Sequence, residues 1–179
     1  DGEVSDTRIV GDVLYAVSNQ SGYYGYYRFS ETGTTTVTSI NIADPNNMTQ
    51  VQKLSFPKDG YDHHTNVTDQ TIIIATTVWK DSCLTEPPAG PAIVAPQVCQ
   101  IDMPETTFQE TIFQLIDIGN PSGQMTNLAK FPARGFLQDR WGMDIHQGIF
   151  RVITNSNSGN GYPILTTFTL DGTANVKQL

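Results

Sequence analysis

The sequence is poor in charged residues, and positive charge is the scarcer kind. Only 16% of its 179 residues are charged, and ten Lys and Arg are outnumbered by eighteen Asp and Glu, which gives a formal net charge of -8. Proteins bind nucleic acids and anionic membranes through Lys and Arg that replace counterions. The composition therefore excludes nucleic acid as a partner and indicates that neutral polar side chains supply the solubility.

Long apolar runs and helical periodicity are also missing. The strongest apolar run, at 71–76, has the length of a strand, whereas a membrane-spanning helix needs roughly 20 apolar residues. No window keeps apolar residues at helical spacing over three turns, because Thr, Gly, Pro and Asn interrupt each one. We predict an all-β protein without a transmembrane segment. Since the chain starts at Asp1 with no signal peptide, we expect a processed piece of something longer.

Cysteine is limited to Cys83 and Cys99, which flank a segment containing four prolines. A disulfide between them would stabilise the fold by about 3 kcal/mol on the chain-entropy estimate. Two buried free thiols are the alternative, and no further Cys or His stands at zinc-site spacing to them. The predicted Cys83–Cys99 disulfide indicates an oxidising compartment, so we expect a secreted, periplasmic or cell-surface protein.

One segment of similar sequence occurs three times. It begins with a β-rich strand after a polar turn, and the three copies of this strand align without a gap. They are 11–18, 69–76 and 147–154. It continues with an alternating strand that ends in a tight turn, because Pro fixes φ and Asx side chains bond their own backbone. These strands and turns are 40–45, 116–121 and 168–172.

Two further strands complete each copy. The strand that follows the tight turn is expected at 51–56, 128–131 and 176–179, and Pro57 and Pro132 are expected to end the first two. The strand that precedes the copy is expected at 4–10, 63–68 and 141–146.

Four antiparallel strands that recur at roughly 40 to 50 residues are typical of β-propeller blades. We predict a single segment, 1–179, of three four-stranded blades. They cover about 4–57, 61–132 and 136–179, with a cysteine loop at 80–110 inserted between the second and third strands of the middle blade. Propellers typically close with four to eight blades, so we expect an arc of a larger or multi-chain propeller. Its partners would be the remaining blades of the parent chain or other subunits. A two-sheet sandwich is the alternative fold, although it does not require the segments to recur in order.

Segments 5–15 and 143–152, together with the strand and turn at 40–45, carry a resemblance. There the chain resembles a family of secreted bacterial proteins with a β-propeller distantly related to WD40 repeats. The resemblance implies a secreted propeller with more blades than these three. It implies no catalytic residues.

Carboxylates and imidazoles occur together on two of the predicted innermost strands. Asp62 and His64 lie on one, and Asp144 and His146 on the other, and such strands face the central channel of a propeller. Together the four could hold a divalent metal ion. The alternative is that the histidines are simply exposed or hydrogen-bonded at strand ends. No cofactor is otherwise predicted, and no Gly-x-Ser-x-Gly motif places a nucleophile.

Other segments suggest contact surfaces. The aromatic run at 21–29 could bind protein or carbohydrate through its tyrosines, or could bury them against a neighbouring blade. These tyrosines are Tyr23, Tyr24, Tyr26 and Tyr27. The segment 139–141, Asp-Arg-Trp, is expected to tie one blade to the next. Asn47 and Asn66 each begin an N-glycosylation motif, and Asn47 lies in a predicted turn.

The sequence favours a non-catalytic extracellular or cell-surface binding and assembly module. A metal-dependent extracellular enzyme with its site at the channel is one alternative. A structural subunit of a surface layer or filament is the other.

Overall fold

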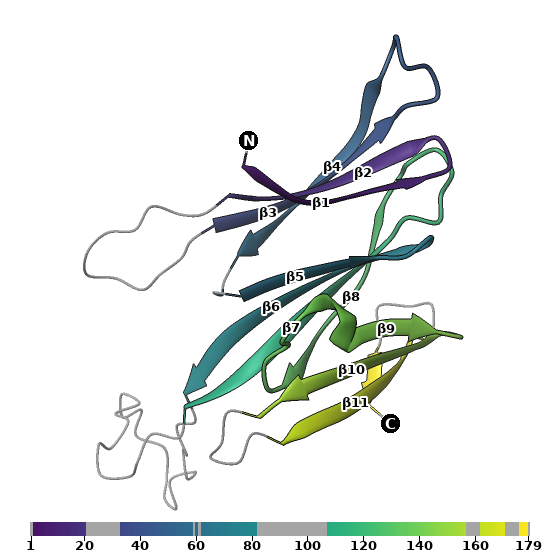
Figure 1. Cartoon of the computed structure of the whole chain (residues 1–179). Helices are drawn as coiled ribbons and strands as arrows, with labels where there is room; N and C mark the ends of the chain where they lie inside the picture. Colours follow the sequence, from purple (N-terminus) through teal and green to yellow (C-terminus); the bar gives the residue numbers. More distant parts are fainter. Residues whose placement is uncertain are drawn as a thin grey trace, which may run out of the picture.

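The computed structural model describes residues 2–20, 33–58, 60, 62–81, 107–156, 162–170 and 176–178. Within them, twelve strands form three four-stranded antiparallel sheets, which confirms the all-β prediction. Figure 1 shows the sheets stacked in chain order as an open arc. We call them sheets 1, 2 and 3.

The strands of each sheet follow one another in space as they do in the sequence. Sheet 1 contains β1 (Glu3–Val10), β2 (Val13–Gln20), β3 (Gly33–Asn41) and β4 (Thr49–Lys58). Sheet 2 contains β5 (Asp62–Val67), β6 (Thr71–Asp81), β7 (Thr107–Asp117) and β8 (Thr126–Arg134). Sheet 3 contains β9 (Met143–His146), β10 (Ile149–Asn155), β11 (Pro163–Leu170) and β12 (Val176–Gln178), and the short helix η1 (Arg140–Gly142) precedes it.

Two prolines do not end their strands, contrary to the prediction. Pro57 lies opposite Thr34 inside β4, which continues to Lys58, and Pro132 lies opposite Ile112 inside β8, which continues to Arg134. Both strands are at the edge of their sheet, where proline is tolerated because only every second N–H points toward a neighbouring strand.

Strand boundaries also differ from the predicted ones at the cysteine loop and before sheet 3. β6 and β7 extend into the segment assigned to the cysteine loop, since β6 ends at Asp81 and β7 begins at Thr107. The innermost strand of sheet 3 begins at Met143, because Trp141 belongs to η1.

Successive side chains of β6 point to opposite faces of sheet 2, and both faces are covered by a neighbouring sheet. Ile72 and Ile74 pack into a core shared with sheet 1, whereas Ile73 and Ala75 pack into a core shared with sheet 3. All four are at most 5% exposed. Such a strand reads as a continuous apolar run because neighbouring sheets bury both of its faces.

The two cores differ in kind. The core between sheets 1 and 2 is mainly aliphatic, with Tyr15 buried in it and Phe56 packed against it. The core between sheets 2 and 3 contains a cluster of phenylalanines whose ring centroids lie 4.5 to 6.1 Å apart. They are Phe113, Phe131, Phe150 and Phe168. Among the described residues no helix is long and apolar enough to span a membrane.

Candidate functional site at the inner strands and the outer sheet faces

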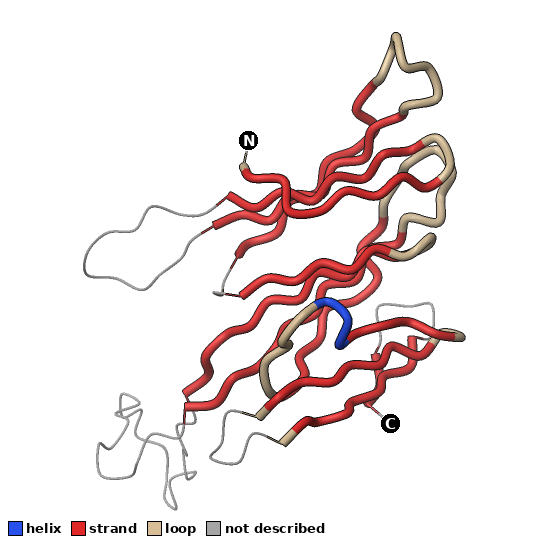
Figure 2. Tube along the Cα trace, viewed as in Figure 1, coloured by secondary structure: helices blue, strands red, loops and turns tan. Residues whose placement is uncertain are grey.

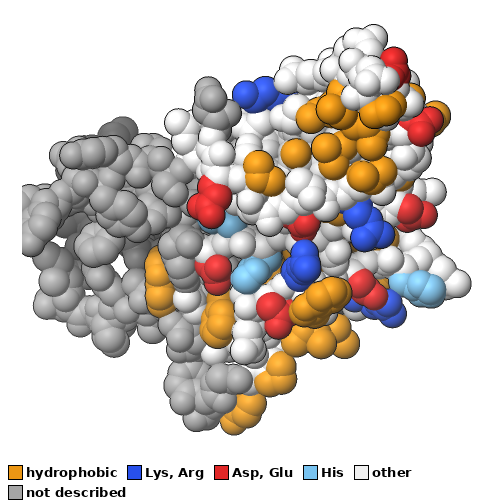
Figure 3. All heavy atoms as spheres, turned by 45° about the horizontal axis from the view of Figure 1, so that its top comes forward, with side chains coloured by type: hydrophobic (Ala, Val, Ile, Leu, Met, Phe, Trp, Pro, Cys, Tyr) orange, Lys and Arg blue, Asp and Glu red, His pale blue; other side chains and the backbone are white. Residues whose placement is uncertain are grey.

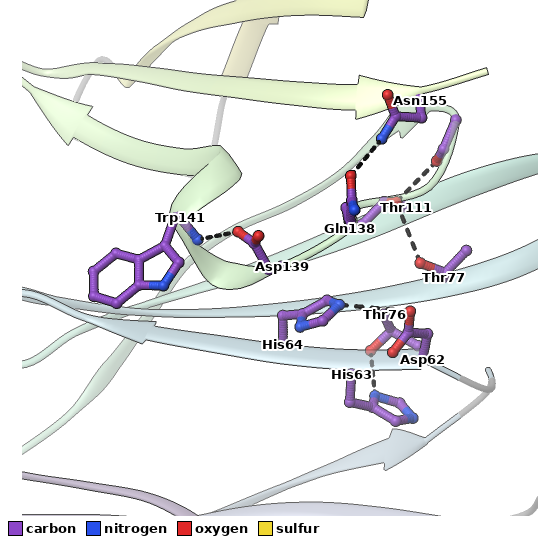
Figure 4. Close-up of polar contacts among 11 residues, drawn as sticks. Asp62, His63, His64, Thr76, Thr77, Thr111, Gln138, Asp139, Trp141 and Asn155 are labelled. Atoms are coloured by element: carbon purple, nitrogen blue, oxygen red, sulfur yellow. Dashed lines mark hydrogen bonds and ion pairs between the residues drawn. The ribbon is translucent and has the colours of Figure 1, made fainter. Parts of the chain in front are cut away.

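The first strand of sheet 2 brings one predicted pair together. Asp62 and His64 lie on the face of β5 that is turned to sheet 3, since His64 is opposite the core residue Ala75. The Nε2 atom of His64 is shielded from solvent and lies 3.5 Å from Oδ2 of Asp62. Figure 4 shows His63 on the other side of β5, where its Nδ1 atom lies 3.0 Å from Oγ1 of Thr76. The pair is therefore a carboxylate–imidazole contact on the face of β5 turned to sheet 3, with the Asp62 side chain 44% exposed.

The second predicted pair is arranged differently. Arg151 lies directly opposite Asp144 across β9 and β10 and donates two hydrogen bonds to its carboxylate, one of them from Nε at 2.8 Å. This bidentate contact with Arg151 lowers the pKa of Asp144 below its ordinary value. His146 is exposed on the same strand. Arg151 thus occupies both oxygens of the carboxylate that would have served as a ligand.

The four predicted metal ligands do not converge. In the part of the chain that the structure describes, no group of three or more His, Cys, Asp and Glu side chains could hold a metal ion. Asp62 and His64 offer two ligands at most, and Asp144 is engaged by Arg151. A divalent metal at the inner strands stays a prediction from the sequence.

A line of buried threonines joins sheets 2 and 3 near this pair. The hydroxyl of Thr111 donates to the carbonyl of Gly135 at 2.8 Å and lies 3.5 Å from the hydroxyl of Thr77 (Figure 4). Thr154 donates in the same way to the carbonyl of Arg134. Each of the three threonines is at most 1% exposed. Sequence reasoning missed this line because threonine is a common strand residue and carries no signal of its own.

The segment 139–141 contacts the neighbouring sheet 2 and also reaches sheet 1. Asp139 accepts a hydrogen bond from the backbone of Trp141 at 2.8 Å, and η1 packs against β5. Arg140 donates to Oδ2 of Asp6 in β1 at 3.1 Å and stacks on the ring of Trp141, 5.0 Å from its centroid. Arg140 therefore connects the start of sheet 3 to sheet 1.

Three further contacts hold the sheets together. The Gln52 side chain accepts from the backbone N–H of Met125 at 2.6 Å and donates to the Met125 carbonyl at 3.2 Å. Tyr15 donates to the carbonyl of Ile118, and burial together with the charge of Asp117 raises the pKa of its hydroxyl. Asn66 donates to the carbonyl of Met143 in β9 at 3.0 Å.

The outer face of sheet 1 has an open aliphatic row beside a more polar one that contains Thr7, Thr38 and Lys53. The face also contains Ile9, Leu14, Ala16 and Ile40, and Ile9, Leu14 and Ile40 form the aliphatic row across β1, β2 and β3. Ile9 is 59% exposed. Figure 3 turns the top of Figure 1 forward and shows hydrophobic side chains gathered over sheet 1.

The outer face of sheet 3 is mixed. Ile153 and Leu165 lie opposite each other and are 50% and 67% exposed. The ion pair between Asp144 and Arg151 stands on the same face. Arg151 occupies the repeat position that Tyr15 fills in sheet 1 and Ile73 fills in sheet 2.

Several predicted residues lie outside the described residues. These are Cys83, Cys99, Tyr23, Tyr24, Tyr26 and Tyr27. The predicted glycosylation motifs of Asn47 and Asn66 lie within the described residues, with Asn47 exposed in the turn between β3 and β4 and Asn66 on β5.

A family model described as a β-propeller domain matches residues 23–177. The chain belongs to this β-propeller family. Its three sheets are therefore propeller blades, and β1, β5 and β9 are the first strands of blades 1, 2 and 3.

Two solved structures resemble this propeller chain. They are a glutamate-to-aspartate variant and a threonine-to-alanine variant of the apocarotenoid oxygenase from Synechocystis. Each is 13% identical to this chain, and each match covers 93% of this chain, with TM-scores of 0.44 and 0.43. The chain spans about a third of their length, 35% and 34% respectively. No curated protein sequence matches the chain.

Proposed function

We propose that this chain is a non-catalytic assembly and binding module of a secreted or cell-surface propeller, and that further blades cover the outer faces of blades 1 and 3. The observation that carries the proposal is the contrast between the middle blade and its neighbours. Both faces of blade 2 are covered, with Ile72 and Ile73 fully buried, whereas Ile9 and Leu165 on the outer faces are mostly exposed.

The repeat supports this assignment position by position. Leu14 occupies the place of Ile72 in blade 2 and of Phe150 in blade 3, and both of these are fully buried by the preceding blade. Burial of apolar surface is favourable by about 25 cal/mol per Å². An aliphatic row in the same position on blade 1 therefore fits the apolar face of another blade.

The two outer faces fit different partners. On blade 3, an apolar partner would take the charges of Asp144 and Arg151 out of water without replacing their hydration, which is costly. A blade that covers blade 3 should therefore present polar groups opposite this pair. The proposed propeller would have chemically distinct contacts at its two ends.

One rim of the arc is proposed as the ligand-binding surface. The second strands of all three blades, β2, β6 and β10, end on the same side of the molecule (Figure 2). The tyrosine run at 21–29 and the loop with the proposed Cys83–Cys99 disulfide directly follow two of these ends in the sequence. Connections at one rim of repeat proteins commonly carry binding sites, so we propose a protein or carbohydrate ligand there.

Sedimentation velocity over a concentration series tests the assembly proposal. The chain should associate reversibly, because the aliphatic row on the outer face of blade 1 is open. The double substitution Leu14→Thr with Ile40→Thr should weaken this association by roughly tenfold or more, equivalent to about 1.4 kcal/mol. Arg8→Lys, a conservative change elsewhere on blade 1, is the matched control and should leave it unchanged. A chain that remains a stable monomer into the hundred-micromolar range would contradict the proposal.

A further inference from the structure

Two of the three N-glycosylation motifs, those of Asn47 and Asn66, lie in very different surroundings, and the third, Asn19-Gln20-Ser21, ends outside the described residues. We propose that Asn47 is an acceptor for an N-linked glycan. Asn66, in contrast, stays unmodified because its side chain makes a contact between two blades. The inference rests on the extracellular location proposed above, but not on how the blades assemble.

Asn47 lies in a turn that is stabilised by other groups. Its backbone N–H donates to the carbonyl of Asp44 at 3.0 Å, and the backbone N–H of Asn46 donates to Oδ1 of Asp44 at 2.9 Å. These bonds use backbone groups and the carboxylate of Asp44. The turn can therefore keep its shape when the Asn47 side chain is modified.

All three residues of the first motif face solvent. Asn47 is exposed, Met48 is 59% exposed, and Thr49 is exposed at the start of β4 opposite Asn41. An enzyme could therefore reach both the amide of Asn47 and the hydroxyl of Thr49 without opening a core. A bulky polar glycan at such a site stays in water.

The second motif is built into the fold. The Nδ2 atom of Asn66, which would carry the sugar, donates to the Met143 carbonyl of the next blade at 3.0 Å. Val67 packs against the core between blades 1 and 2. The Thr68 hydroxyl donates to the Thr71 carbonyl at 3.1 Å and accepts from the Thr71 N–H at 2.9 Å. A glycan on Asn66 would break a contact between two blades.

The position of Asn47 is compatible with the proposed contacts. The turn between β3 and β4 lies at the end of blade 1 opposite the end of β2 (Figure 1). A glycan there would be on the rim opposite the proposed ligand-binding rim. It would also project away from the core between blades 1 and 2.

The reaction needs an oligosaccharide carried on a polyprenyl diphosphate and a transferase that recognises the motif. A bond forms between Nδ2 of Asn47 and the anomeric carbon of the sugar, and the bond from that carbon to the phosphate oxygen breaks. Polyprenyl diphosphate leaves, and Nδ2 gives up one proton to a base of the transferase. No electrons are exchanged with another reactant.

The test is expression of the chain behind a secretory leader in cells that contain such a transferase, followed by intact-mass measurement with and without an N-glycosidase. The experiment uses an Asn19→Gln background, because Asn19-Gln20-Ser21 is a third acceptor motif. In this background we expect one glycan, which is lost in Asn47→Gln and in Thr49→Ala and is retained in Asn66→Gln and in Thr49→Ser. Since the leader supplies the compartment, the result reports acceptor competence and not native location, and the sedimentation experiment reports assembly separately.

A matched control comes from the equivalent turn of blade 2. There Asn120 and Ser122 are exposed and are separated by Pro121, which blocks the motif, so Pro121→Ala should add a second glycan. If the Pro121→Ala chain accepts a glycan at Asn120 while Asn47 stays unmodified, the proposal is overturned. A glycan found at Asn66 would overturn it as well. Thermal unfolding of Asn47→Gln should match that of the unaltered chain.

Discussion

Residues at the same position of the repeat differ in solvent exposure among the three blades, and the difference depends on whether a neighbouring blade covers them. Ile72 and Phe150 are fully buried beneath the preceding blade, whereas Leu14 at the same position of blade 1 is partly exposed. The residue type is apolar in all three cases. An apolar residue at this position therefore indicates a blade face suited to contact with another blade. Only the structure shows which of these faces are in contact with a neighbouring blade within this chain.

The covered interfaces also differ from each other. Blades 2 and 3 meet through four phenylalanines, while blades 1 and 2 meet through aliphatic side chains and long-range hydrogen bonds from Tyr15 and Gln52. The aromatic interface carries larger buried side chains, so its truncation should cost more. Both interfaces also contain polar contacts, from Tyr15 and Gln52 between blades 1 and 2 and from Asn66 and Thr154 between blades 2 and 3.

The largest effect should come from shortening equivalent residues on a covered and an open face. Phe150→Ala removes a ring that contacts three other phenylalanines and should lower the free energy of unfolding by about 3 to 5 kcal/mol. Leu14→Ala should lower it by about 1 kcal/mol or less. Urea denaturation of both variants measures the difference. Similar losses would show that Leu14 is covered in solution or that Phe150 is not.

The next effect concerns the polar contact between blades 1 and 2. Gln52→Ala leaves the backbone N–H and carbonyl of Met125 without their partners and should destabilise the fold by about 1 to 3 kcal/mol. Gln50→Ala, at an exposed position of the same strand, is the control and should be close to neutral. Equal effects of the two substitutions in urea denaturation would show that the Gln52 contact does not stabilise the interface between blades 1 and 2.

A smaller effect is expected at alkaline pH. The pKa of Tyr15 is raised in the folded chain, so its contribution to stability is complete below the ordinary value of 10.0 and is lost as the pH rises through the folded value. Tyr15→Phe should cost about 1 kcal/mol at neutral pH, because its hydrogen bond to Ile118 is removed. The variant should also lose less stability than the unaltered chain above pH 10.0, as measured by thermal unfolding across that range.

The blade pattern could be predicted from the sequence because strand alternation and Asx turns are local. The aligned strands begin at Val13, Thr71 and Ile149, as the alignment of the repeat requires. The contacts between blades could not be predicted, because Gln52 and Met125 are distant in sequence and neither residue type signals a partner. The metal hypothesis did not anticipate Arg151, since the pairing of Arg151 with Asp144 depends on the register of β9 and β10.

The smallest effect tests the mixed face of blade 3. The pKa of Asp144 is lowered in the folded chain, so the stabilisation by its pair with Arg151 is present above the ordinary value of 3.8 and is lost as the pH falls through the folded value. Solvent screens this exposed pair, so the loss should be small, and Asp144→Asn should abolish it. Thermal unfolding between neutral and strongly acidic pH measures it. A large acid-dependent loss that disappears in Asp144→Asn would show that the ion pair is shielded from solvent, and therefore that a partner already covers this face of blade 3.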